Sequence, residues 1–211
     1  MLFRSYASDV QFTPETEEEY RQMEGEIDQI RFVVDGALWE QIGQLDQQSE
    51  VDEATTVIAL IQGEEFAVDS DRLKTAYYYY QFTLEPMNEA EVREFYVANE
   101  LLYREAQAQG LNAGSEEVDE YIAKLREDLP GDPEGYAEFC DYLRGLGLTE
   151  DEYWETHREE YHEELTREKL GEKLRADYYK EQPGTTEVSF DEYYRNEYRP
   201  WLFEKYRVEM L

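Results

Sequence analysis

The feature that most constrains the fold is a succession of helix start signals, each followed by apolar residues at steps of three and four. Asn88 is followed three residues later by Glu91, and Thr149 by Glu152. This spacing is typical of a capping box in the first turn of a helix. The recurring apolar residues form stripes that helices bury against one another. The sequence therefore predicts a mainly α fold.

The N-terminal quarter of the chain predicts one long helix followed by a linker. Thr13-Pro14 is a helix start, and a stripe of apolar residues runs from Glu15 to Gln47, with a bend expected near Gly36. Residues 47–55 are polar and are interpreted as the linker. The predicted domain division is 1–55 for the long helix with its linker, and 56–211 for a helical module.

Further helix starts follow along the module. A single long helix is expected after Thr149, a break over Gln182 to Thr186, and a last helix that kinks or ends near Pro200. The other expected starts lie at Asp69 or Ser70, Asn88, Ser115, Asp132 and Ser189.

Two short segments predict a small two-stranded β element. Val57 to Ile61 is rich in β-branched residues, and Tyr206 to Met210 is a comparable segment near the C-terminus. An unpaired strand with a buried side would leave backbone polar groups without partners, which is costly. We therefore expect these two segments to pair.

The charge of the chain limits its partners. It has 52 acidic and 20 basic residues among 211, a formal net charge of −32. Such a charge repels nucleic-acid phosphates and anionic membrane surfaces, and it favours solubility and cationic partners. No segment approaches the ~20 apolar residues that span a bilayer, so we expect no direct membrane insertion. The first ten residues contain no signal-peptide pattern.

The sequence offers little catalytic or metal-binding chemistry. Its two histidines, His157 and His162, are five residues apart and do not share a helix face. Glu159 and His162 form one Glu-x-x-His pair, whereas a di-iron bundle needs two such pairs. We therefore predict no metal, no cofactor and no enzymatic activity. An enzyme of unknown type stays open as an alternative, after the two non-catalytic functions described below.

Five segments in order, between Thr56 and Leu174, together resemble the SurA N-terminal domain family, which includes the PrsA-type foldases. The first resembles the family's opening strand and turn, and the others resemble its successive helices. They are Val57 to Phe66, Glu100 to Leu111, Ser115 to Ile122, Phe139 to Leu148, and Thr149 to Leu170.

The resemblance implies an extracytoplasmic chaperone module that holds unfolded or extended polypeptides on a helical cradle and brings its chain ends together. The parvulin prolyl-isomerase domain of that family has no room here, so isomerase activity is not expected. The alternative is a structural or assembly protein that binds one folded partner or forms a homodimer through the N-terminal helix. Candidate client-binding residues are Tyr77, Tyr78, Tyr79, Tyr80, Phe82, Tyr96 and Tyr103.

Overall fold

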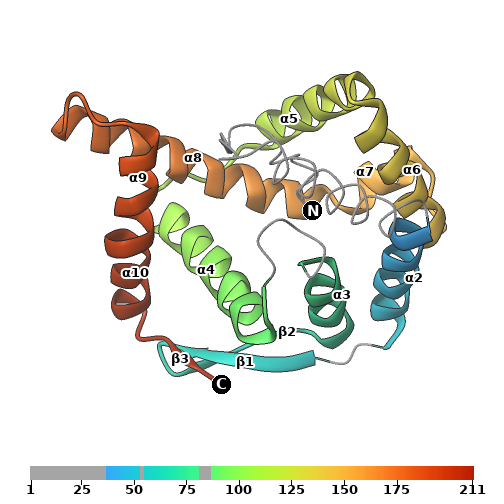
Figure 1. Cartoon of the computed structure of the whole chain (residues 1–211), viewed down its shortest axis with the longest axis horizontal. Coiled ribbons are helices and arrows are strands. Elements are labelled where there is room, and N and C mark those ends of the chain that lie inside the picture. The colour runs from blue at the N-terminus through green and yellow to red at the C-terminus, as the bar shows by residue number, and fades with distance from the viewer. Residues whose placement is uncertain (1–36, 53–54, 81–86) are drawn as a thin grey trace, which may run out of the picture.

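The computed structural model describes residues 37–52, 55–80 and 87–211, which form a mainly helical protein with one small sheet (Figure 1). The predicted helix over Glu15 to Gln47 falls for the most part outside the described residues, as does the homodimer proposed through it. The elements are α2 Ala37–Asp52, β1 Thr55–Ile61, β2 Glu64–Asp69, α3 Ser70–Tyr80, α4 Glu89–Ala108, α5 Ser115–Asp128, a 3₁₀ turn Leu129–Gly131, α6 Pro133–Leu146, α7 Glu150–Thr156, α8 Arg158–Glu181, α9 Glu187–Tyr193, the π turn η2 Tyr194–Tyr198, α10 Arg199–Lys205 and β3 Glu209–Met210.

The sheet has three antiparallel strands in the order β2-β1-β3, not two. The predicted link between the first strand and the C-terminus is confirmed, since Ala59 pairs with Met210 and Leu60 with Glu209. The C-terminal strand is shorter than the predicted Tyr206 to Met210, because Tyr206 caps α10 and β3 covers only Glu209–Met210. The missed strand, β2, returns from β1 through Gln62 and Gly63, whose φ angles are 55° and 84°. Two positive φ angles in sequence match the hairpin turns that suit the twist of strands.

We expect removal of Val208–Leu211 to lower the thermal unfolding midpoint by several degrees, as for the loss of ~1 kcal/mol or more. The deletion removes the β1–β3 ladder and a bond from the Leu211 amide to the Ile58 carbonyl (3.0 Å). It also removes the Leu211 carbonyl that accepts from Arg93 (3.0 Å). Calorimetry of the truncated chain measures the shift, and a midpoint within about a degree of the full chain would contradict the prediction.

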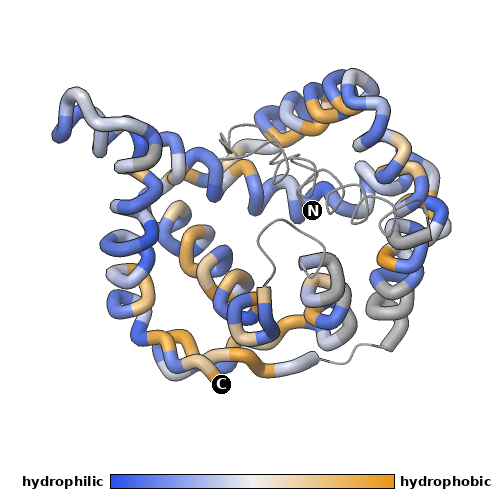
Figure 2. Tube along the Cα trace, in the orientation of Figure 1, coloured by the Kyte–Doolittle hydropathy of each residue, from blue (hydrophilic) through white to orange (hydrophobic). Residues whose placement is uncertain are grey.

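The buried apolar residues form two clusters. The first core cluster joins α2, α5, α6, α7 and the start of α8, and the second joins the sheet to α4, η2 and α10. Figure 2 shows apolar residues along β1 and α4, whereas α9 is largely hydrophilic. The largest fully buried side chains of the first cluster are Ile42, Val118, Phe139 and Tyr153, and those of the second are Ile58, Ile61, Val97, Leu101 and Leu202.

Helices α2 and α6 pack with their backbones in direct contact. A Cβ placed on Gly43 would overlap the carbonyl oxygen of Tyr142, and one placed on Gly145 would overlap that of Glu40. The linker predicted over residues 47–55 is helical as far as Asp52, where α2 ends. Polar residues can extend a helix whose preceding turns are docked, since tertiary packing provides most of its stability.

The expected single helix after Thr149 is divided at His157 into α7 and α8. The Thr156 hydroxyl donates to the carbonyl oxygens of Glu152 (2.9 Å) and Tyr153 (3.2 Å). Such bonds from a side chain to the preceding turn bend helices. Arg158, the first residue of α8, bonds Asp119 on α5.

The last helix, predicted to kink or end near Pro200, is interrupted just before that residue, and α10 begins at Arg199. The π turn η2 separates α9 from α10 immediately before Pro200. Proline has no N–H for the helical ladder, and single π turns accommodate such interruptions. The capping boxes at Asn88 and Thr149 are also present as predicted.

Candidate functional site

A groove lies between α5 and the segment that contains α7 and the first residue of α8. Four positions on each side line it with the same spacing, at i, i+3, i+4 and i+7. Residues at these intervals share one face of a helix. The lining residues are Asp119, Ile122, Ala123 and Arg126 on α5, and Asp151, Trp154, Glu155 and Arg158 opposite.

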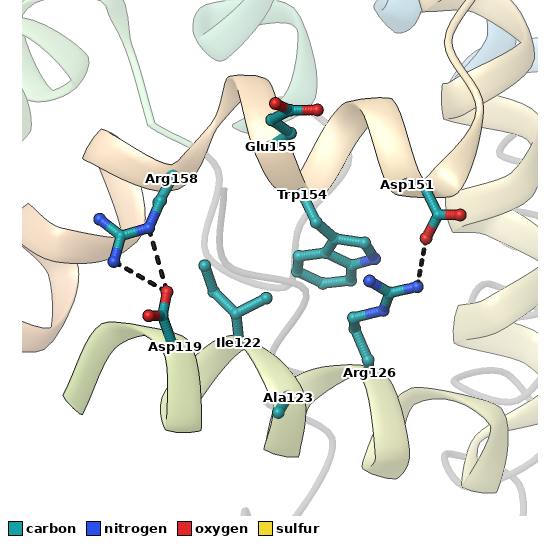
Figure 3. A pocket seen from close by; sticks show the side chains of 8 residues that line it. All are labelled: Asp119, Ile122, Ala123, Arg126, Asp151, Trp154, Glu155 and Arg158. Atoms are coloured by element: carbon teal, nitrogen blue, oxygen red, sulfur yellow. Dashed lines mark hydrogen bonds and ion pairs between the residues drawn. The ribbon is translucent and has the colours of Figure 1, made fainter. Parts of the chain in front are cut away.

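The two sides are joined by crossed ion pairs, one at each end of the groove (Figure 3). The Arg158 Nε and Nη2 atoms donate to Asp119 Oδ1 at 3.1 and 2.8 Å. At the other end, Arg126 Nη2 donates to Asp151 Oδ1 at 2.5 Å. Each side therefore begins with an aspartate and ends with an arginine, so the two sides run antiparallel.

The floor of the groove is apolar and is part of the protein core. Trp154 and Ile122 are 6% and 9% exposed and belong to the first core cluster. The Trp154 ring contacts Phe139 and Tyr161, and its Nε1 donates to Glu150 at 3.3 Å. The hollow measures about 350 Å³, near the lower end of the ~300–1,000 Å³ range of ligand sites. A hollow of this size can accept an apolar side chain.

Carboxylates stand outermost in the groove. The side chains of Asp119 and Asp151 are 64% and 83% exposed, compared with 37% for Arg158 and 42% for Arg126. The arginines are also held from a second direction, since Arg158 Nη2 donates to the Ser115 carbonyl at 3.0 Å and Arg126 lies 3.9 Å from Glu150. A ligand that approaches the groove meets acidic side chains first.

The tyrosines predicted to bind clients are only partly described. The side chains of Tyr78 and Tyr79, and the whole of Phe82, lie outside the described residues. Tyr77 is half-buried on α3. Tyr80 on α3 and Tyr96 on α4 both contact the Phe95 ring, with centroids 5.5 and 6.1 Å away. The Tyr80–Phe95 contact thus contributes to the packing of α3 on α4, whereas the Phe95–Tyr96 contact lies within α4.

Tyr96 and Tyr103 have different surroundings along α4. Burial raises the pKa of Tyr96, although the neighbouring guanidinium of Arg72 opposes the shift. Arg72 also pairs with Glu160 on α8 at 2.8 Å. Tyr103 lies edge-on to His162, with centroids 6.3 Å apart. The candidate tyrosines whose side chains are described, Tyr77, Tyr80, Tyr96 and Tyr103, are half-buried. Their role in client binding stays a prediction.

The histidines do not gather a metal site in the described part of the chain. His157 Nδ1 lies 3.0 Å from the Tyr153 carbonyl oxygen, and His162 Nδ1 lies 3.5 Å from a Glu159 carboxylate oxygen. Over residues 37–52, 55–80 and 87–211, no group of three or more potential metal-ligating side chains occurs.

A second hollow of about 380 Å³ lies beside the end of α8. Its lining is predominantly polar and includes Gln182, Thr185, Glu192 and Asn196, together with the stacked rings of Tyr178 and Tyr193. It has no buried apolar floor like that of Ile122 and Trp154. The groove between α5 and α7 is therefore the better site for an apolar group.

Sequence reasoning did not identify the groove. Asp119, Ile122 and Arg126 repeat the spacing of Asp151, Trp154 and Arg158, and this repeat was a usable signal. It lies in two segments that were interpreted as helices and as part of the resemblance to the SurA N-terminal domain family, without a binding role for these residues.

A scan against protein-family models and searches of curated proteins and of solved structures found no match to the chain. Among the helices that the structure describes, none is long and apolar enough to cross a membrane.

Proposed function

We propose that the protein is a non-catalytic, chaperone-like module that binds unfolded or extended polypeptide segments in the groove between α5 and α7. The observation that supports this function most directly is the apolar floor of Ile122 and Trp154 between two charged rims. An extended chain can place one apolar side chain on this floor, while its polar backbone stays near the rims.

The shape of the groove suits holding a segment rather than reacting with it. Both arginines are paired with aspartates, and the lining contains no serine, cysteine, lysine or histidine; its remaining polar group is the carboxylate of Glu155. The resemblance to the SurA and PrsA foldases adds an extracytoplasmic location to the proposal. Binding of one folded partner is the alternative.

We expect the protein to suppress aggregation of a chemically denatured client at equimolar ratio, and Ala123→Trp to abolish most of that suppression. Ala123 is exposed in the groove, so an indole at this position fills the hollow without entering a core. Light scattering during dilution of the client from denaturant measures the effect.

The matched control is Ala176→Trp, which places the same side chain on an exposed position of α8 outside the groove. This variant should suppress aggregation like the unmodified chain. Thermal unfolding of both variants checks that they are folded. Absence of suppression by the unmodified chain, or full suppression by Ala123→Trp, would rule out the proposed site.

A further inference from the structure

We propose that the groove selects extended segments in which an apolar residue has a basic residue two positions before it and two positions after it. This inference rests on the proposed function and names the class of segment that the same site binds. It follows from the charge of the rims and from the separation of the two exposed aspartates.

The helices around the groove have a large surplus of acid. α5 has six acidic and two basic residues, and α7 has four acidic and no basic residues. The arginines that line the groove are already paired with Asp119 and Asp151. The site therefore offers no unpaired cation to an acidic segment, whereas a basic segment meets carboxylates on both rims.

Each aspartate retains capacity for a further donor. The bonds from Arg158 and Arg126 go to the Oδ1 atoms of Asp119 and Asp151. A carboxylate has about four lone-pair sites, so its second oxygen can accept from an incoming guanidinium or ammonium group. A basic side chain of the client can thus bind without displacing either arginine.

The two aspartates stand at diagonally opposite ends of the groove (Figure 3). Seven residues of helix span ~10 Å along the groove, and packed helices lie roughly 8–10 Å apart. The diagonal between these two positions, taken along and between the helix axes, is therefore about 13 Å. An extended chain rises ~3.3 Å per residue and alternates its side chains between faces. Residues i−2, i and i+2 face the same way, and the outer two are about 13 Å apart.

The test uses three capped peptides that share a central leucine. One contains Arg-Gln-Leu-Gln-Arg, the second has the same composition in the order Gln-Arg-Leu-Arg-Gln, and the third contains Glu-Gln-Leu-Gln-Glu. We expect the first to bind the full chain several-fold more tightly than the second and at least about tenfold more tightly than the third, as for two exposed charge pairs. Calorimetric titration at about 50 mM salt measures the affinities, and the preference should shrink as salt screens the exposed charges.

Variants separate the groove from the general charge of the protein. Asp119→Asn combined with Asp151→Asn should remove the preference for the first peptide, whereas Ala123→Trp should abolish its binding. Equal binding of the first two peptides would overturn the spacing, and equal binding of the basic and acidic peptides would overturn the charge selection while leaving the proposed function intact. Tight binding of the basic peptides to Ala123→Trp would overturn the inference, because attraction to the net charge would explain it. Absence of binding by all three peptides would count against the proposed function itself.

Discussion

Replacement of Gly145 by alanine is expected to lower the free energy of unfolding by about 1–3 kcal/mol, the usual cost of overpacking a core. The new Cβ would overlap the backbone carbonyl of Glu40 on α2, and a backbone cannot move aside as a flexible side chain can. The overlap outweighs the gain of up to ~1 kcal/mol that alanine normally brings to a helix. Denaturant titration measures the change.

The matched control is Gly171→Ala on α8, where a new Cβ meets no atom within 4 Å. This variant should be as stable as the unmodified chain or more stable by up to ~1 kcal/mol, since only the helix propensity changes. The two substitutions are chemically identical and are expected to have opposite signs. A stabilising effect of Gly145→Ala would show that α2 does not rest on α6 at this distance.

Replacement of Glu105 by alanine is expected to destabilise the protein by roughly 2–4 kcal/mol. The donors that bond its buried carboxylate would lose their acceptor. Glu105 is 3% exposed. Its carboxylate accepts bonds from Lys205 at 2.5 Å, from the Tyr206 hydroxyl at 3.0 Å and from Gln109 at 2.9 Å. These bonds join α4 to the end of α10, and Tyr206 would be left buried without its acceptor.

The effect of Glu105→Ala should depend on pH. Burial alone would raise the pKa of Glu105, but the bonds from Lys205, Gln109 and Tyr206 outweigh burial and lower the pKa. Because the folded-state pKa lies below the unfolded value of about 4.3, the stabilisation is complete above that value and is lost as the pH falls through the folded-state value. The difference between the variant and the unmodified chain should thus stay constant from pH 7 down to about 4.3 and shrink as the pH falls further.

An exposed glutamate, Glu172 on α8, provides the control. Glu172→Ala should change the free energy of unfolding by less than about 0.5 kcal/mol at pH 7, as surface substitutions usually do. Equal effects of Glu172→Ala and Glu105→Ala, or a Glu105→Ala effect that stays constant with pH, would contradict the role of the Glu105 contacts.

The fold was predictable where local signals determined it. The capping residues Asn88 and Thr149 mark the starts of α4 and α7 because their side chains bond the first backbone amides. The division of the helix at His157 was not predictable, since it depends on the hydrogen bonds that the Thr156 hydroxyl makes to backbone carbonyls. β2 was missed because Glu64 and Glu65 are exposed and its packing, rather than its composition, makes it a strand.

The candidate site was less predictable than the fold. The candidate tyrosines were chosen because they are aromatic. Whether an aromatic ring faces solvent depends on its burial in the fold, which the sequence does not give. Among the described residues, the exposed large apolar side chains are instead Trp201, Met210 and Leu211. The groove arises where Asp119 on α5 meets Arg158 of α8, 39 residues later. The sequence of either helix alone does not show that these two residues meet.

The place of β3 has a consequence for synthesis on the ribosome. β1 is made early, yet its neighbour on one side is formed by Glu209–Met210. Tyr206 and Leu202, which fill the second core cluster beside β1, are also made late. Until these residues leave the exit tunnel, Ile58 and Ile61 lack part of their covering. The first core cluster, complete by Tyr161, can form beforehand, so we expect the nascent chain to fold in two stages, with the sheet closed last.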